Sequence, residues 1–226
     1  CFILKFKPTI PDADGKIKGN IDADLVLRAA LESHEYDKAV VVSSDGTKIG
    51  ARLTSPSGTD KFVIFDTEKK SLKALPQNTV SLAFSPDGLQ IVIAVLENNA
   101  YKIYVAETDG SKSTVVTTTK IPDLMLDWYS ENNVAFKTKA AGTAYGLIYS
   151  LNLKTKKVSR VLGSVYGLTG EYSPSGEKLL YSQTNSLGKE LALKALDLSK
   201  KTESKINLVS LPEKCAWSKD NRTVFC

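Results

Sequence analysis

One short pattern recurs five times along the chain: an apolar stretch, a polar turn with Asp or Ser before Gly or Asn, and a second apolar stretch. The residues that mark the turns are separated by 42, 44, 44 and 45 positions. Such regular spacing indicates a repeat architecture in which each period builds the same structural unit. The five marks are Gly46, Gly88, Asn132, Gly176 and Asn221.

The residue types in these turns have a physical explanation. A proline fixes φ near −65° at the second turn position, and the marking Gly or Asn takes the positive φ that the following corner requires. We interpret Asp45, Asp87 and Asp220 as turn formers whose carboxylates bond to the backbone. Calcium binding is the weaker interpretation, because no acidic cluster surrounds any of the three.

Each period contains four stretches rich in β-branched and aromatic residues, which favour strands. In one unit these are residues 79–85, 90–97, 101–108 and 112–119, and Asp109-Gly110 between the last two is a hairpin signal. Third strands are also expected at 61–66, 146–153 and 191–198, each followed by a short polar turn rich in Lys. Four strands in roughly 44 residues is the signature of a β-propeller blade, so we predict a mainly β fold of four-stranded antiparallel blades.

The corner Ser85-Pro86-Asp87-Gly88 resembles those of TolB-like, WD-related propellers, and the resemblance covers about residues 47–226. The resemblance says little about the ligand. Because propellers present loops around a central channel and function is grafted onto those loops, we expect a non-enzymatic binding or scaffold module that contacts a protein or another macromolecule. The Gly-His and Trp-Asp dipeptides of WD repeats are absent, as is the Asp-box spacing of sialidases, so a glycosidase is not supported.

We expect blades near residues 38–76, 79–119, 124–162 and 165–207, and a half blade at 214–226. This number does not close a ring of the usual six to eight blades. We therefore expect the chain to be an incomplete propeller and a fragment of a longer protein.

The first 46 residues depart from the repeat. Residues 2–7 alternate like a strand, residues 20–33 have the spacing of a helix with one apolar side, and residues 38–43 are a short apolar strand. This order predicts a βαβ segment with parallel strands.

Lys18-Gly19-Asn20-Ile21-Asp22, followed by Ser43-Ser44-Asp45-Gly46, resembles the LabA-like NYN ribonucleases of the PIN superfamily. The resemblance implies that Asp22 and Asp45 help to hold Mg or Mn, which activates water for attack on RNA. The alternative function is therefore a metal-dependent ribonuclease with a propeller targeting module. We expect it to be inactive, because Thr47 replaces the second Asp of the family motif and propeller sequence follows at once.

The cysteines are Cys1, Cys215 and Cys226. If Trp217 faces Val224 across a hairpin, Cys215 lies opposite Cys226, within reach of a disulfide. Two buried thiols in a reducing compartment are the other interpretation, and the sequence leaves both open. A disulfide favours the cell envelope or periplasm, whereas the ribonuclease alternative favours the cytoplasm.

The sequence offers little other chemistry. His34 is the only histidine, no cysteine spacing fits zinc, and no phosphate-binding loop is present, so we expect no cofactor. The 30 Lys and Arg exceed the 25 Asp and Glu by +5 but are scattered, so a nucleic-acid partner is expected only under the ribonuclease alternative. No apolar run approaches the roughly 18 residues of a membrane span.

Overall fold

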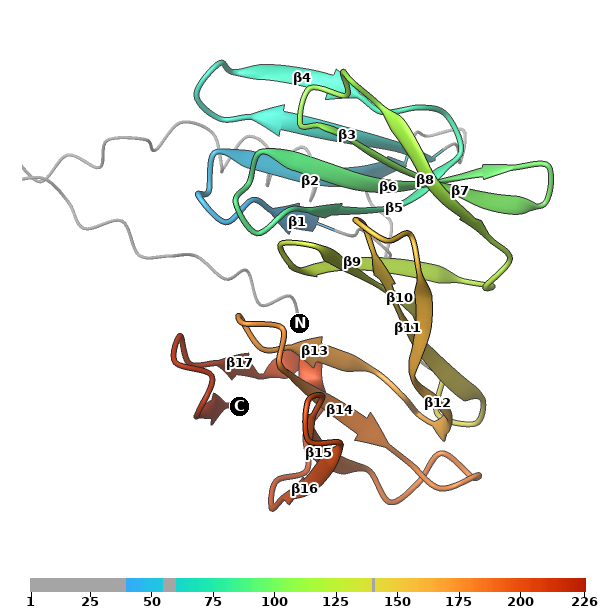
Figure 1. Ribbon diagram of the computed structural model, residues 1–226, viewed down its shortest axis with the longest axis vertical. Coiled ribbons are helices and arrows are strands. Elements are labelled where there is room, and N and C mark those ends of the chain that lie inside the picture. The colour runs from blue at the N-terminus through green and yellow to red at the C-terminus, as the bar shows by residue number, and fades with distance from the viewer. Residues whose placement is uncertain (1–39, 55–59, 140) are drawn as a thin grey trace, which may run out of the picture.

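The computed structural model describes residues 40–54, 60–139 and 141–226. Apart from one short 3-10 helix, the described elements are strands, arranged in four four-stranded antiparallel sheets and one two-stranded sheet. Figure 1 shows the sheets following one another along the chain, with the first two at the top of the view and the fourth at the bottom. The predicted mainly β fold class is confirmed.

The strands of the first two sheets lie close to their expected positions. The first sheet consists of β1 (Val40–Val42), β2 (Lys48–Thr54), β3 (Asp60–Asp66) and β4 (Ser71–Ala74). The second consists of β5 (Thr79–Phe84), β6 (Gln90–Glu97), β7 (Ala100–Glu107) and β8 (Thr114–Thr119).

The remaining sheets continue the same order. The third consists of β9 (Leu124–Ser130), β10 (Asn133–Thr138), β11 (Tyr145–Asn152) and β12 (Val158–Tyr166). The fourth consists of β13 (Gly170–Tyr172), β14 (Lys178–Gln183), β15 (Ala192–Asp197) and β16 (Thr202–Ile206). The 3-10 helix η1 (Pro212–Lys214) then leads to a hairpin of β17 (Ala216–Trp217) and β18 (Val224–Phe225).

Two observed boundaries differ from the expected ones. β12 continues to Tyr166, so the fourth sheet begins at Gly170 and not at residue 165. β1 pairs antiparallel with β2, which places residues 40–46 in the first sheet, where the blade count also put them. The rest of the expected βαβ segment, including Asp22 and His34, lies outside the described residues.

The sheets cover one another through shared apolar clusters, because alternate residues of a strand point to opposite faces. In β6, Ile91, Ile93 and Val95 pack toward the first sheet, while Val92 and Ala94 pack toward the third. All five are at most 5% exposed. Fully burying a Val or Ile side chain contributes about 1.5–3 kcal/mol, so both faces of this sheet contribute to stability.

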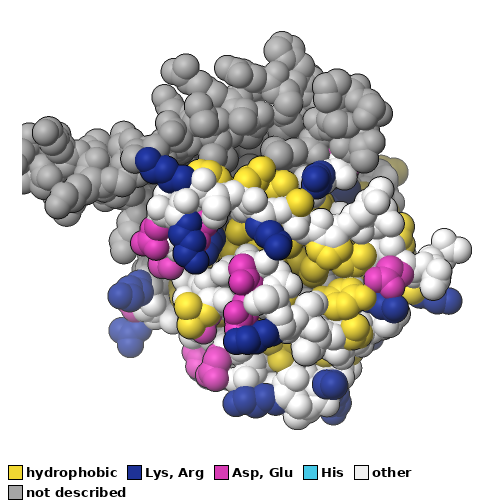
Figure 2. Space-filling model, turned by 90° about the horizontal axis from the view of Figure 1, so that it is seen from above, with side chains coloured by type: hydrophobic (Ala, Val, Ile, Leu, Met, Phe, Trp, Pro, Cys, Tyr) yellow, Lys and Arg dark blue, Asp and Glu magenta, His cyan; other side chains and the backbone are white. Residues whose placement is uncertain are grey.

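The same arrangement continues along the chain. Ala135 and Leu179 belong to the cluster between the third and fourth sheets, and Leu180, the next residue of β14, belongs to the cluster between the fourth sheet and the hairpin. Each sheet is therefore held by its neighbours in sequence. Seen from above, basic and acidic side chains are mixed over the outer surface around a central hydrophobic area (Figure 2). Within residues 40–54, 60–139 and 141–226, no helix combines the length and apolar character needed to cross a membrane.

Candidate functional site

The connections between the first and second strand of each sheet, which we call the corners, share one hydrogen-bond network. In four of the five, a serine hydroxyl accepts a hydrogen bond of 2.9–3.1 Å from the backbone N–H five residues later. Three residues after the serine, a Gly or Asn with φ between 60° and 75° donates its N–H to the serine carbonyl. The serines are Ser43, Ser85, Ser173 and Ser218. This local chemistry explains why the sequence repeats the pattern.

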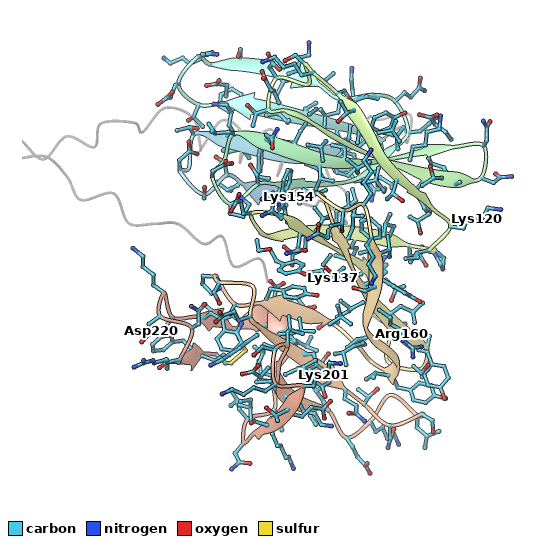
Figure 3. The ribbon with its side chains drawn as sticks, viewed as in Figure 1. Lys120, Lys137, Lys154, Arg160, Lys201 and Asp220 are labelled. Atoms are coloured by element: carbon cyan, nitrogen blue, oxygen red, sulfur yellow. A yellow bond between two sulfur atoms is a disulfide. The ribbon has the colours of Figure 1, made fainter. Side chains whose placement is uncertain are left out.

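Asp45, Asp87 and Asp220 complete the network in three corners; Asp220 is labelled in Figure 3. Each carboxylate accepts a bond of 2.5–2.6 Å from the corner serine and one of 3.0–3.1 Å from the backbone N–H two residues later. The serine hydroxyl is the main cause of the lowered pKa of each carboxyl. The interpretation of these aspartates as turn formers is confirmed.

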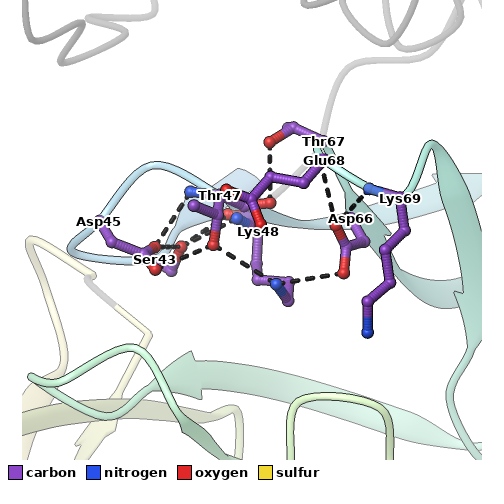
Figure 4. Close-up of polar contacts among 8 residues, drawn as sticks. All are labelled: Ser43, Asp45, Thr47, Lys48, Asp66, Thr67, Glu68 and Lys69. Atoms are coloured by element: carbon purple, nitrogen blue, oxygen red, sulfur yellow. Dashed lines mark hydrogen bonds and ion pairs between the residues drawn. The ribbon is translucent and has the colours of Figure 1, made fainter. Parts of the chain in front are cut away.

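The ribonuclease resemblance implied that Asp45 helps to hold a metal. In the structure its carboxylate forms hydrogen bonds within its own corner (Figure 4). Its Oδ1 accepts bonds from the Ser43 hydroxyl and the Thr47 N–H, and its Oδ2 accepts one of 2.9 Å from the Thr47 hydroxyl. Asp22 lies outside the described residues. Among the residues that the structure describes, no three His, Cys, Asp or Glu side chains gather as a metal site requires. Nothing in this region supports the ribonuclease alternative.

The third corner is built differently. Its serine is Ser130, whose hydroxyl accepts a hydrogen bond of 2.9 Å from the side chain of Asn133 across a turn that is one residue shorter. Tyr129, the residue before it, stacks its ring on Tyr172 of the fourth sheet with 3.8 Å between centroids. Its hydroxyl shares a hydrogen bond of 2.6 Å with Ser150, while burial raises its pKa. A Cβ at Gly176 would lie 2.9 Å from the Tyr129 ring, so glycine provides the space for this contact. We expected a positive φ at Asn132, the mark of this corner. That prediction is wrong, because β9 and β10 meet there in a tighter turn.

Several corners contact one another directly. The Ser175 N–H donates a bond of 2.9 Å to the side chain of Asn221, and the Lys178 ammonium donates one of 3.0 Å to its carbonyl. A Cβ on Gly88 would lie 3.5 Å from the Asp45 carboxyl, so the first two corners are also neighbours. These contacts join the first corner to the second and the fourth to the fifth, as Tyr129 joins the third to the fourth.

The turns between third and fourth strands lie at the same end of the sheets as the corners. Backbone bonds of 2.8–2.9 Å connect Thr67 to Thr47, Leu153 to Asn132, and Leu198 to Glu177. We call the corners and these turns together the corner face. The turns carry exposed lysines, of which Lys154 and Lys201 are labelled in Figure 3.

A carboxylate also fixes the turn in two of the sheets. Asp66 accepts bonds from the N–H groups of Glu68 and Lys69, at 3.1 and 2.9 Å. Asp197 accepts equivalent bonds of 3.1 and 2.9 Å in the fourth sheet. The backbone N–H bonds, that of Lys69 first, lower the pKa of the Asp66 carboxyl. The backbone of these turns is therefore held in place from within.

Lys137 is a charged residue at a sheet boundary whose environment the sequence did not indicate (Figure 3). Its ammonium lies 2.9 Å from Asp127 and 3.0 Å from the carbonyl oxygen of Gly170 in the next sheet. Burial opposes its charge, but the negative charges of Asp127 and Glu171 outweigh it and raise the pKa of Lys137. The ion pair of Lys137 and Asp127 therefore connects the third sheet to the fourth.

The hairpin carries the remaining predicted site residues. Ala216 pairs with Phe225 and Trp217 with Val224, which confirms the proposed register. One step further out, Cys215 and Cys226 are joined by a disulfide, with 4.1 Å between their Cα atoms. Cys215 is buried with Leu180 and Leu193, whereas Cys226 is exposed.

The chain is similar in structure to several propeller proteins. It matches TolB from Acinetobacter baumannii with a TM-score of 0.60 and 17% identity, over 83% of this chain and 48% of TolB. The β-propeller domain of the Trilobed protease from Pyrococcus furiosus gives 0.54 and 13%, over 76% and 58%. A chain of a nidogen/laminin complex gives 0.54 and 8%, over 76% and 65%.

These likenesses establish the fold alone, because each identity is below 20%. The chain spans less than two thirds of the length of each of these proteins. No family model matches the chain, and no curated protein matches it. The TolB-like part of the expected resemblance is supported at the level of fold, and the comparisons offer no support for a ribonuclease segment.

Proposed function

We propose that this chain is part of a non-enzymatic β-propeller module that binds another protein through its corner face. The direct contacts between corners carry the proposal. They couple the first corner to the second, and the third, fourth and fifth to one another, so a partner would meet a preorganised surface and would lose little loop entropy on binding. Binding residues are commonly placed on loops held by a rigid scaffold.

The chemistry of the corner side chains also favours binding over catalysis. The serine hydroxyls and the Asp carboxylates bond to one another and to the backbone, so their polar atoms already serve the turns. A hydrolytic nucleophile requires a hydroxyl hydrogen-bonded to a base that can take its proton at neutral pH. Carboxylates with a lowered pKa are poor bases for this purpose.

The cell envelope is the compartment that we propose. Disulfides persist in oxidising compartments and are rare in the cytosol. The Cys215–Cys226 bond is the observation that supports this location. Fractionation followed by thiol labelling without reductant tests it, and finding both thiols free in a cytoplasmic fraction would contradict it.

Two leucines of nearly equal exposure allow a direct test of the binding face. Leu89, 68% exposed, lies in the second corner, and Leu187, 70% exposed, lies in a loop at the opposite end of the sheets. A photo-crosslinking amino acid at Leu89 should give a saturable, reproducible adduct with one protein, competed by unlabelled chain. The same group at Leu187 should not. An adduct only from Leu187, or from neither position, would refute the proposal.

A further inference from the structure

A lysine with left-handed backbone recurs in the same connection of all four complete sheets. Each lies in the turn between the third and fourth strands, with φ of 50°, 50°, 56° and 56°. Their separations of 42, 44 and 45 residues follow the period of the corners. These turn lysines are Lys70, Lys112, Lys156 and Lys201.

Lysine is a poor choice for this conformation on backbone grounds. The left-handed region costs an L-residue roughly 1–2 kcal/mol, and Gly and Asn tolerate it best. The chain itself follows that preference elsewhere: among the described residues, the other left-handed non-glycine positions are Asn78, Asn98, Asn99, Asn221, Asp123, Ser164 and Glu190. None of those is lysine, whereas the last residue of the turn is a left-handed lysine in three of the four sheets; in the second sheet Gly110 holds that position and the left-handed Lys112 follows two residues later. The backbone therefore does not explain the choice.

Contacts within the described structure do not explain it either. All four side chains are exposed. Lys112 forms an ion pair with Glu107 in its own turn. Among the described residues, Lys70, Lys156 and Lys201 have no ion-pair partner. The ammonium groups of these three lysines are thus directed to solvent at the rim of the corner face.

The charges around the turn lysines indicate the kind of surface they can meet. More lysines stand beside them, such as Lys69 and Lys200, but acids are interspersed, such as Glu68 and Asp109. A continuous polyanion such as nucleic acid or an anionic membrane would meet these acids as well, and like charges brought together oppose binding. A protein that presents separate carboxylates opposite the lysines avoids this repulsion.

We propose that the four turn lysines bind exposed carboxylates of an acidic protein partner, which extends the proposed binding function to a class of ligand. Lysine is retained at the strained position because its charge contacts the partner. Exposed complementary charges act mainly on association rate and partner choice, and the interaction weakens with salt.

The test replaces all four turn lysines by Asn, which suits the left-handed backbone. The probe is a fluorescent twelve-residue peptide of alternating Glu and Ser, followed by anisotropy at low salt. Because exposed ion pairs are individually weak, we expect the four changes together to weaken peptide binding about tenfold. The melting temperature should stay the same or rise.

A matched control removes the same charge from the opposite end of the sheets, where Lys61, Lys120, Lys189 and Lys214 are exposed. Their replacement by Asn should leave peptide binding within about twofold, because charges beyond a Debye length are largely screened. Equal loss in both variants would overturn the proposal, as would a lower melting temperature of the turn variant, which would make the lysines structural.

Two further arms separate this proposal from the one on which it rests. Heparin or phosphatidylglycerol vesicles that bind more tightly than the peptide, with the same dependence on the turn lysines, would overturn the acidic-protein partner. If the Leu89 crosslink saturates at the same partner concentration in the turn-lysine variant as in the native chain, the lysine proposal fails while the binding face stands. If Leu89 gives no crosslink in the native chain, the proposed function fails by itself.

Discussion

The second sheet and the terminal hairpin show two ways to hold the same kind of unit. β6 has neighbours on both faces, so Ile91 to Val95 are all buried. The hairpin has two paired positions, the apolar cluster that it forms among the described residues is shared with the fourth sheet, and Phe225 on its last strand is 64% exposed. An isolated two-stranded hairpin is marginal in water. The comparison teaches that apolar burial is sufficient where a sheet is covered twice, whereas the hairpin depends on a covalent link.

The largest effect is expected from a substitution that creates a cavity between the second and third sheets. Phe136 is 1% exposed and belongs to the cluster between the second and third sheets. Replacing it by Ala should lower the free energy of unfolding by about 3–5 kcal/mol, because both the buried ring and its packing are lost. Urea denaturation measures this, and Leu187→Ala, at an exposed position, should change the value by less than about 0.5 kcal/mol. A loss below 1 kcal/mol for Phe136→Ala, roughly the cost of an ordinary substitution, would mean that the cluster is not a core.

Removing the disulfide should act mainly on the hairpin. The Cys215–Cys226 link has a sequence separation of 11, and closing a loop of this size stabilises by about 2–3 kcal/mol. In Cys226→Ser, the amide of Ser218, which donates a hydrogen bond of 2.8 Å to the Thr223 carbonyl across the hairpin, should exchange with deuterium faster by the corresponding factor, while those of β6 stay protected. Thiol titration provides the control: the native chain should expose one thiol before reduction and three after. Faster exchange throughout β6 would show that the two regions are not independent.

The corner serines allow the same turn to be compared in both regions. Ser85 is 5% exposed in the second sheet, whereas Ser218 lies in the hairpin and is less buried. Ser85→Ala leaves the partly buried hydrogen bond to the N–H of Gln90 without its acceptor, which should cost about 1–2 kcal/mol. Ser218→Ala should cost less, because water can replace the lost bond to Thr223. Equal costs in thermal unfolding would contradict the difference in burial.

The smallest effect concerns the carboxylate of Asp87. The Ser85 hydroxyl, then the Leu89 N–H, lowers its pKa in the folded chain. A carboxyl with a lowered folded pKa stabilises the fold above its unfolded pKa of about 3.9, and this contribution disappears as the pH falls through the folded value. Carbon NMR titration should therefore place the midpoint of Asp87 below that of an ordinary Asp and raise it in Ser85→Ala. An unchanged midpoint in the variant would show that the serine is not the cause.

The sequence was informative where the structure depends on local chemistry. The turn residues around Asp87 and Asp220 specify their corners within a few positions, so the repeat located the sheets and most strands. The register of the hairpin followed from pairing Trp217 with Val224. At the end of the third sheet, β12 extends to Tyr166, and its pairing with β11 contains two register shifts that no turn signal marks.

The features that the sequence did not reveal depend on contacts between sheets. Lys137 meets Asp127 from the adjacent strand and Gly170 from the next sheet, a combination that no local spacing encodes. Tyr129 and Tyr172 lie at the ends of first strands, where aromatic residues are expected to fill space between blades, but their direct stacking over more than forty residues is a contact that no local spacing encodes. The sequence shows that the turns are rich in lysine, but only the backbone of the structure shows that the turn lysines are left-handed.

Because each apolar cluster is divided between two successive sheets, every repeat carries one half of the interface before it and one half of the interface after it. Duplicating a single repeat of 42–45 residues therefore supplies both complementary halves at once. A gene for such a chain can gain or lose whole repeats by recombination while every new junction stays complementary. Variation in repeat number is accordingly an easier evolutionary change for this architecture than exchange of a side chain within one of its clusters.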